Sequence, residues 1–141
     1  MAVNFHQQTT CTLKDRNKLK SFIFKLFKKE GKELETLDII FCTDEYLLQI
    51  NKDHLAHDYY TDIITFDLSP SKETATVGEL YISIDRVKDN AKTHAVSFTN
   101  ELHRVIFHGS LHLCGYKDKK KDDISVMRKM EEKYLSLYSY K

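Results

Sequence analysis

Residues 108–118 read HGSLHLCGYKD, and this stretch decides how the rest of the chain is interpreted. His108 and His112 are four residues apart, so on a helix they lie on one face with Cβ atoms about 5–6 Å apart. That spacing lets two imidazoles reach one metal ion. Gly115 readily takes the left-handed conformation that ends a helix, which would let Asp118 return toward the histidines. Because two histidines and a carboxylate leave a position open on zinc, the stretch predicts a catalytic metal site with these three ligands.

The helix expected at residues 99–113 is apolar almost all the way round, which is typical of a helix at the centre of its domain. One buried histidine alone would more often be a structural residue, but the pair followed by a glycine and a carboxylate favours a metal site. Gly109 costs up to about 1 kcal/mol relative to alanine inside a helix, so it predicts close approach of another backbone or a ligand. It also disfavours a peptidase of the H-E-x-x-H type, whose general-base glutamate would stand at position 109.

The composition of the whole chain is that of an ordinary soluble globular protein. It has 141 residues, 41% hydrophobic and 30% charged, which favours a single domain spanning residues 1–141. The net charge of +1 excludes a global basic field, so any nucleic-acid surface must be a local patch. Three widely spaced cysteines, no signal-peptide pattern and no apolar run of about 18–20 residues together predict buried thiols and a cytoplasmic location.

Hydrophobic periodicity predicts an α+β fold close to α/β, with a small mixed four-stranded sheet and about five helices packed on it. Alternating and β-branched runs predict strands at residues 3–6, 37–43, 61–68 and 78–84, the last two as an antiparallel pair joined by a long loop. Stripes of apolar residues predict helices at residues 13–30, 44–54, 84–96, 99–113 and 122–138. Asp44 is the expected N-cap of the second helix, and the helix with the two histidines is expected at the centre.

The motif at residues 108–118, together with shorter segments upstream, resembles the YbeY family of bacterial metal-dependent endoribonucleases. The family signature is H-G-x-L-H-L-x-G-Y-D-H, and this chain keeps seven of its nine fixed positions. Segments similar to the family's L-N-x-x-(F/Y)-R, T-D-V-L-S-F and G-D-I-x-I motifs, and to its helix-start glutamate, stand at residues 50–54, 61–66, 78–82 and Glu101. The resemblance covers roughly residues 37–118.

This resemblance implies metal-dependent hydrolysis of single-stranded RNA, in maturation of the 3′ end of small-subunit ribosomal RNA and in ribosome quality control. It implies one Zn²⁺ per chain, although two positions depart from the family. Asp118 stands where the family has its third histidine ligand; aspartate is an acceptable zinc ligand, but its negative charge weakens the Lewis acid and widens the choice of divalent metal. Leu55 stands where the family has an arginine that is thought to serve the active site.

Basic residues near the motif are candidates for holding RNA. Three lysines flank Asp118 and are suited to the phosphate backbone: Lys117, Lys119 and Lys120. A solvated turn is the alternative, because acidic residues at 122 and 123 offset part of this charge. The cations near position 55 are Lys52, His54, His57 and Arg86, and the sequence does not show which of them replaces the missing arginine. Of these, His54 and Arg86 are further candidates for binding RNA.

Glu101 shares the helix stripe of the two histidines and is a tempting general base. It lies seven residues, or about 10.5 Å, along the helix from His108. Because that is too far for direct proton transfer, we expect Glu101 to act as a first-turn charge that favours the helix dipole.

Three functional classes therefore follow from the sequence, and RNA hydrolysis leads. The second is a ribosome-associated RNA-binding factor that keeps a structural metal but turns over little substrate, which the leucine at position 55 makes credible. The third is a metallopeptidase, which Gly109 disfavours. RNA and the ribosome are the expected partners, and a monomer is favoured.

Overall fold

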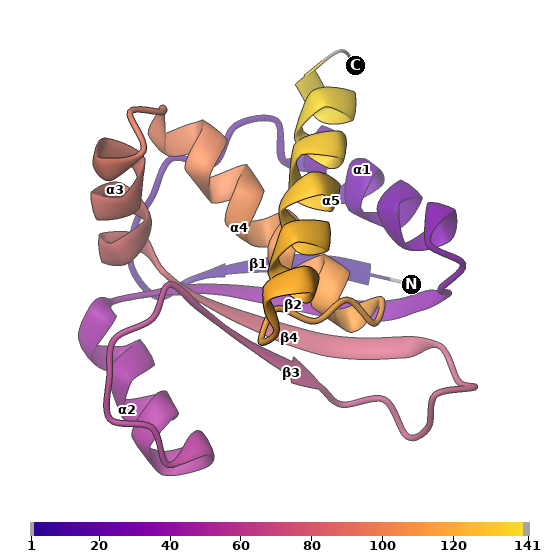
Figure 1. The fold of residues 1–141 in the computed structure, drawn as a ribbon, viewed down its shortest axis with the longest axis horizontal. Helices are drawn as coiled ribbons and strands as arrows, with labels where there is room; N and C mark the ends of the chain where they lie inside the picture. Colours follow the sequence, from indigo (N-terminus) through magenta and orange to yellow (C-terminus); the bar gives the residue numbers. More distant parts are fainter. Residues whose placement is uncertain (1, 140–141) are drawn as a thin grey trace.

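Strands and helices follow one another in the predicted order, β-α-β-α-β-β-α-α-α, over residues 2–139, which the computed structural model describes (Figure 1). The strands are β1 (Ala2–Gln7), β2 (Leu34–Cys42), β3 (Ile63–Asp67) and β4 (Thr76–Ser83). The helices are α1 (Arg16–Lys29), α2 (Asp44–Leu55), α3 (Ile84–Thr93), α4 (Phe98–Leu113) and α5 (Lys121–Ser139). The α+β class is confirmed. Of the expected domain, Met1, Tyr140 and Lys141 lie outside the described residues.

The four strands form one mixed sheet in the order β1-β2-β4-β3. β2 lies between β1 and β4 and runs parallel to both, whereas β3 and β4 form the antiparallel pair that the sequence predicts, with Ile63 opposite Ile82. Figure 1 shows α1, α4 and α5 on one side of this sheet and α2 on the other. The last strand pair therefore lies beneath the helix that carries the histidines.

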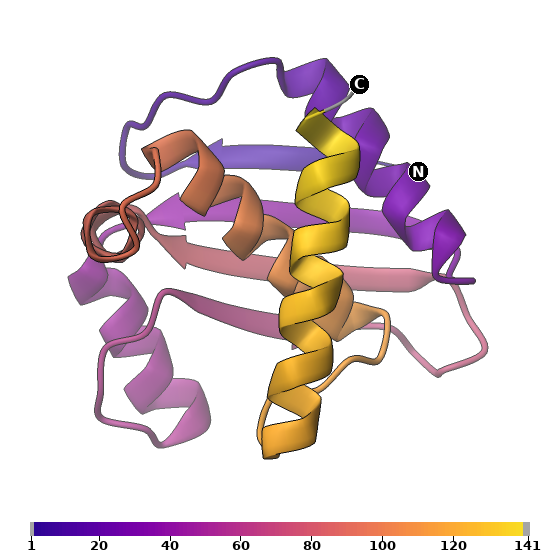
Figure 2. The same cartoon turned by 45° about the horizontal axis from the view of Figure 1, so that its top comes forward.

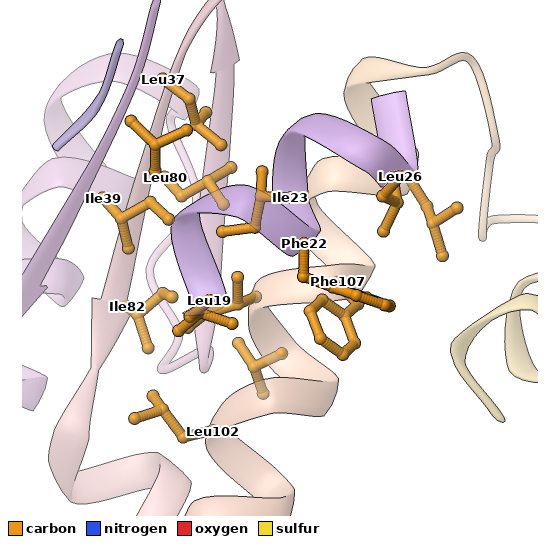
Figure 3. Packing of buried hydrophobic residues seen from close by; sticks show 14 of the residues in the cluster. Leu19, Phe22, Ile23, Leu26, Leu37, Ile39, Leu80, Ile82, Leu102 and Phe107 are labelled. Carbon is orange, nitrogen blue, oxygen red and sulfur yellow. The ribbon is translucent and has the colours of Figure 1, made fainter. Parts of the chain in front are cut away.

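The main core lies between the sheet and the layer made by α1 and α4, as Figure 3 shows. In β4, Leu80 and Ile82 point into this core, and Tyr81 between them packs on the opposite face with α2. This alternation follows from the two-residue period of a strand. In Figure 2, α5 crosses over α4, so α4 is covered on both sides. The prediction of a central histidine helix is confirmed.

One helix start and one helix cap differ from the prediction. Asp15 takes a left-handed backbone conformation (φ 51°), so α1 begins at Arg16 rather than at residue 13. The prediction that Asp44 caps α2 is wrong, because the extended Thr43 does so: its side-chain oxygen accepts a hydrogen bond from the Tyr46 amide at 3.2 Å. Asp44 is instead drawn into an ion pair with Arg86 of α3.

The prediction of buried thiols is confirmed for one of the three cysteines. Cys42 is buried, Cys11 and Cys114 are half-buried, and all three are free thiols. Burial raises the pKa of both Cys42 and Cys114 to about 12, so these thiols are protonated and unreactive at neutral pH. Within residues 2–139, none of the helices combines the length and the apolar character needed to cross a membrane.

Gly109 lies where α4 packs tightly against β3 and β4. A Cβ atom at this position would stand 2.7 Å from Cδ1 of Ile63 and 2.8 Å from Cδ2 of Leu80. The close approach predicted from the glycine is therefore real, but the groups that approach are side chains of β3 and β4 rather than a backbone or a ligand. The glycine sets how near the histidine helix lies to the last strand pair.

Replacing Gly109 with valine should overpack this contact. We expect G109V to lower the free energy of unfolding by about 2 kcal/mol or more, because both neighbouring side chains belong to a filled core. Chemical denaturation of the two proteins would measure the loss. The exposed Asn100 of the same helix provides a control, since N100V should change stability by only about 0.5 kcal/mol. Equal effects of the two substitutions would contradict this packing.

Candidate metal centre

The structure brings together the three side chains that the motif predicts as ligands. The Nε2 atoms of His108 and His112 each lie 3.2 Å from the same oxygen, Oδ2 of Asp118. The candidate ligand atoms all fall within 4.8 Å of one another. His108 and His112 lie on adjacent turns of α4, with ring centroids 4.7 Å apart. The four-residue spacing therefore places both imidazoles on one face of the helix, as expected.

A tight turn after α4 returns Asp118 to the histidines. Gly115 has φ +107°, as the sequence predicts, and its amide donates to the His112 carbonyl at 3.0 Å. The next residue, Tyr116, fixes the turn through both its backbone amide and its side-chain hydroxyl. Its amide donates to the Leu111 carbonyl at 3.1 Å, and its hydroxyl donates to Glu30, just after α1, at 2.7 Å. The chain then reaches position 118 before α5 begins.

Each histidine has a hydrogen-bond acceptor on its other ring nitrogen. Nδ1 of His112 lies 2.9 Å from the Tyr116 carbonyl, and Nδ1 of His108 lies 2.6 Å from Oε2 of Glu131. A carbonyl and a carboxylate only accept, so both Nδ1 atoms carry the proton and donate it. In the neutral imidazoles the Nε2 lone pairs then face Asp118.

This arrangement fits a cation. Three acceptors, two Nε2 lone pairs and one carboxylate oxygen, converge on one place, and a divalent ion there would satisfy all of them at once. Histidine ligands whose other ring nitrogen donates to a carboxylate or carbonyl are the usual arrangement around zinc. The donor set therefore fits a bound Zn²⁺ with a position open for water or substrate.

Glu131 is the residue that sequence reasoning missed at this site. It is buried, at 2% exposure, and both its oxygens are used: Oε2 by His108 and Oε1 by Arg104, whose Nη1 donates at 2.9 Å. Burial alone would raise the pKa of Glu131, but hydrogen bonds from His108 and Arg104 outweigh it and lower the pKa. Glu131 is therefore a carboxylate that orients His108.

Arg104 is the second missed residue, and it joins several acidic groups. Besides Glu131 it binds Glu101, with Nη2 at 2.6 Å from Oε2, and its Nη2 lies 3.6 Å from Oδ2 of Asp62 in the loop before β3. Burial would lower the pKa of Arg104, but hydrogen bonds to Glu101 and Glu131 raise it. The only available signal was its position four residues before His108, which places it on the same face of α4.

Glu101 stands in the first turn of α4, as the sequence predicts. It is 1% exposed and is paired with Arg104, and His94 lies 3.5 Å away. A carboxylate so fully engaged cannot reach the three candidate ligands. Its role is to hold Arg104.

A cavity of about 490 Å³ opens beside the candidate ligands. Its lining includes His108, His112 and Asp118 from the motif, and Leu55 and Lys119. Leu55, at the position where the resemblance places the family's arginine, thus faces this cavity with an apolar side chain. The carboxyl group of another lining residue, Asp62, has its pKa raised by burial, an effect that Arg104 and His108 partly oppose.

The predicted RNA-binding residues divide into two groups. Lys117, Lys119 and Lys120 line a second hollow of about 450 Å³, which shares His112 and Asp118 with the motif. His54 and Arg86 do not line either hollow. The His54 ring packs edge-on against Phe66, and the Arg86 guanidinium binds Asp44 and lies over the Tyr60 ring, so its charge is already matched.

Comparison with known proteins places the fold and the motif in one family. A sequence profile described as "Endoribonuclease YbeY" matches residues 2–139. Proteins named Endoribonuclease YbeY are 48% identical over 136 residues in Cytophaga hutchinsonii, covering 96% of this chain and 94% of the relative, and 45% identical in Porphyromonas gingivalis, covering 94% and 87%. The solution structure of a Thermotoga maritima protein shares the fold, with a TM-score of 0.68 at 24% identity over 97% of this chain and 89% of that one. The chain belongs to the YbeY endoribonuclease family.

If Glu131 orients His108, its removal should weaken metal binding. We expect E131Q to lower the affinity for Zn²⁺ by roughly 10- to 100-fold, because one amide oxygen cannot serve both His108 and Arg104. Competition with a chromophoric chelator would measure the affinity, and circular dichroism would confirm that the variant is folded at the assay temperature.

The neighbouring Glu132 is exposed, so E132Q provides a matched control that should bind metal as the unmodified protein does. A folded E131Q protein with unchanged zinc affinity would show that the carboxylate has no part in orienting the ligand.

Proposed function

We propose that this protein is a metal-dependent endoribonuclease that cleaves single-stranded RNA during ribosomal RNA maturation. The observation that carries the proposal is the convergence of His108 Nε2, His112 Nε2 and Asp118 Oδ2 beside an open cavity. Membership of the YbeY family supplies the reaction class, since relatives at up to 48% identity are named endoribonucleases. One domain spanning residues 1–141 would carry the whole activity.

His108, His112 and Asp118 would hold one Zn²⁺ or another divalent ion. When bound, such an ion supplies Lewis-acid activation of water and of a phosphodiester oxygen. The residues of the chain provide the rest. Glu131 and the Tyr116 carbonyl keep the two imidazoles in the tautomer that leaves Nε2 free, and the network around Arg104 fixes Glu131 in turn. Both imidazoles are therefore oriented with Nε2 available to the ion before it binds.

RNA would follow the lysine-lined hollow into the cavity. Lys117, Lys119 and Lys120 lie around Asp118, where their charges can bind phosphates on either side of the scissile bond. Because the overall net charge is only +1, such a local patch would be the electrostatic guide for RNA. We extend the proposal to association with the ribosome, action in ribosome quality control, a cytoplasmic location and a monomeric state.

A second candidate function is RNA binding with little turnover. It is favoured by one observation: Leu55 lines the cavity at the position where the family resemblance expects an arginine. An apolar side chain there cannot stabilise the charge that grows on the phosphate. A peptidase is disfavoured, because position 109 is a glycine packed against Ile63 and Leu80.

The first test removes a ligand. We expect H112A to lose stoichiometric metal and to cleave single-stranded RNA at least 100-fold more slowly, because two ligands hold zinc far less well than three. Elemental analysis and a gel-based cleavage assay would measure the two effects. His6 is an exposed histidine on β1, so H6A should keep both properties. Full cleavage by H112A would contradict the proposed site. If the unmodified protein binds metal but does not cleave RNA, and H112A loses that metal, the binding-factor function is favoured.

The second test changes the charge of the third ligand. We expect D118H to keep one metal per chain and to select Zn²⁺ more strongly over Mg²⁺ and Mn²⁺, because a neutral imidazole replaces a hard anionic oxygen. Parallel titrations with the three ions would measure the selectivity. A D118H protein that binds no metal would mean that the turn at Gly115 does not deliver position 118 to the ion.

A further inference from the structure

Two aromatic rings lie at the wall of the cavity that contains the candidate metal ligands. His57 and Tyr59 both line this cavity, in the loop between α2 and β3. Their rings are stacked, with centroids 5.1 Å apart and planes inclined by 21°, and the Tyr59 hydroxyl lies 2.9 Å from His57 Nδ1. Tyr59 is nevertheless 54% exposed, so much of this pair remains open to solvent.

The loop that carries the pair is fixed to the end of α2. The amide of His57 donates to the Asn51 carbonyl at 3.0 Å, and Asn51 Nδ2 donates to the Tyr59 carbonyl at 2.9 Å. Asn51 itself is 1% exposed, and a salt bridge of 3.4 Å joins Lys52 to Asp58. The backbone that carries the two rings is therefore held in place before any ligand arrives, which lowers the entropic cost of binding.

An exposed tyrosine on a loop is common and by itself indicates nothing. The next residue, Tyr60, shows the ordinary case: its hydroxyl donates to Glu45 at 2.9 Å, its ring lies under the Arg86 guanidinium at 5.3 Å, and it does not line the cavity. Tyr59 differs on each point. Among the described residues its only aromatic partner is His57, and the stacked pair borders the space beside His108, His112 and Asp118.

We propose that the His57–Tyr59 pair is a stacking platform for one unpaired nucleobase of the RNA whose phosphodiester lies at the candidate metal ligands. The inference rests on the proposed function and names how that site holds its substrate. Every base has a π-face, so such a platform accepts any sequence. In a duplex both faces of a base are already covered by its neighbours, so the platform accepts only single strands. The cavity volume of about 490 Å³ is in the range of small-ligand sites.

Leu55 adds apolar surface beside the platform. It is 41% exposed and lines the same cavity, where it offers apolar surface and no charge. The wall formed by Leu55, His57 and Tyr59 is thus suited to the flat, weakly polar face of a base, whereas Lys119 on the same cavity is suited to phosphate. The site would bind the base of a nucleotide on one surface and its phosphate on another.

The test compares two short RNA strands on the metal-loaded protein. One is a fluorescent 2′-O-methyl hexamer, and the other is the same hexamer without bases at its central positions; a gel run after the titration confirms that both are intact. We expect Y59L to bind the intact hexamer roughly tenfold more weakly than the unmodified protein does. It should bind the abasic hexamer unchanged, because the phosphate contacts remain.

Two variants make the comparison specific. Y59F keeps the aromatic face and loses the hydroxyl that contacts His57, so it should bind the intact hexamer more tightly than Y59L does. Y60L removes the adjacent tyrosine, which does not line the cavity, and should also bind both strands unchanged. If Y59L binds the intact hexamer with full affinity, or weakens both strands equally, the platform does not exist.

The same proteins separate failure of this inference from failure of the proposed function. If the unmodified protein cleaves single-stranded RNA with its metal and Y59L has an unchanged KM, the endoribonuclease function stands and the platform is wrong. If the unmodified protein neither binds nor cleaves single-stranded RNA, the proposed function fails, and the platform fails with it. A raised KM in Y59L, with kcat changed little and full metal content, is the result that the platform predicts.

Discussion

One buried carboxylate, that of Glu131, connects the fold to the candidate metal centre. It accepts from Arg104 with one oxygen and from His108 with the other, so it joins α5 to two successive turns of α4. Buried charges are tolerated only when each has its partner, and removing one leaves the others unmatched. The packing of α5 on α4 and the direction of the His108 imidazole are therefore one constraint. A shift of either helix would disturb both.

The turn after α4 completes the site from the other side. Tyr116 supplies the carbonyl that orients His112, and its hydroxyl reaches Glu30 near the end of α1, so the first helix also steadies the ligand loop. This anchoring places Asp118 against the two Nε2 atoms. Because Asp118 is anionic, as a third ligand it would reduce the net charge around a bound divalent ion and with it the strength of the Lewis acid. The wall formed by Leu55 and the aromatic pair His57–Tyr59 then offers a binding contribution that does not depend on charge.

The sequence predicted those features that depend on local periodicity. Three such features follow from the pattern of neighbouring residues. They are the shared helix face of His108 and His112, the positive φ of Gly115 and the antiparallel pair β3–β4. It did not predict the partners of Glu131, which are 23 and 27 residues away, because pairing over such distances depends on how α5 crosses α4. The first-turn position of Glu101 was predicted correctly, but its burial was not. Thr43 rather than Asp44 caps α2, because the side chain of Asp44 is engaged in a tertiary ion pair with Arg86.

A metal ion held by His108, His112 and Asp118 should be required for RNA cleavage. To test this, the purified protein is stripped with a chelator and Zn²⁺ is restored stepwise, while metal content and cleavage of single- and double-stranded RNA are followed together. Cleavage of the single strand should be lost with the metal, return in proportion to zinc, and saturate at one ion per chain. Undiminished cleavage by the metal-free protein would contradict this requirement.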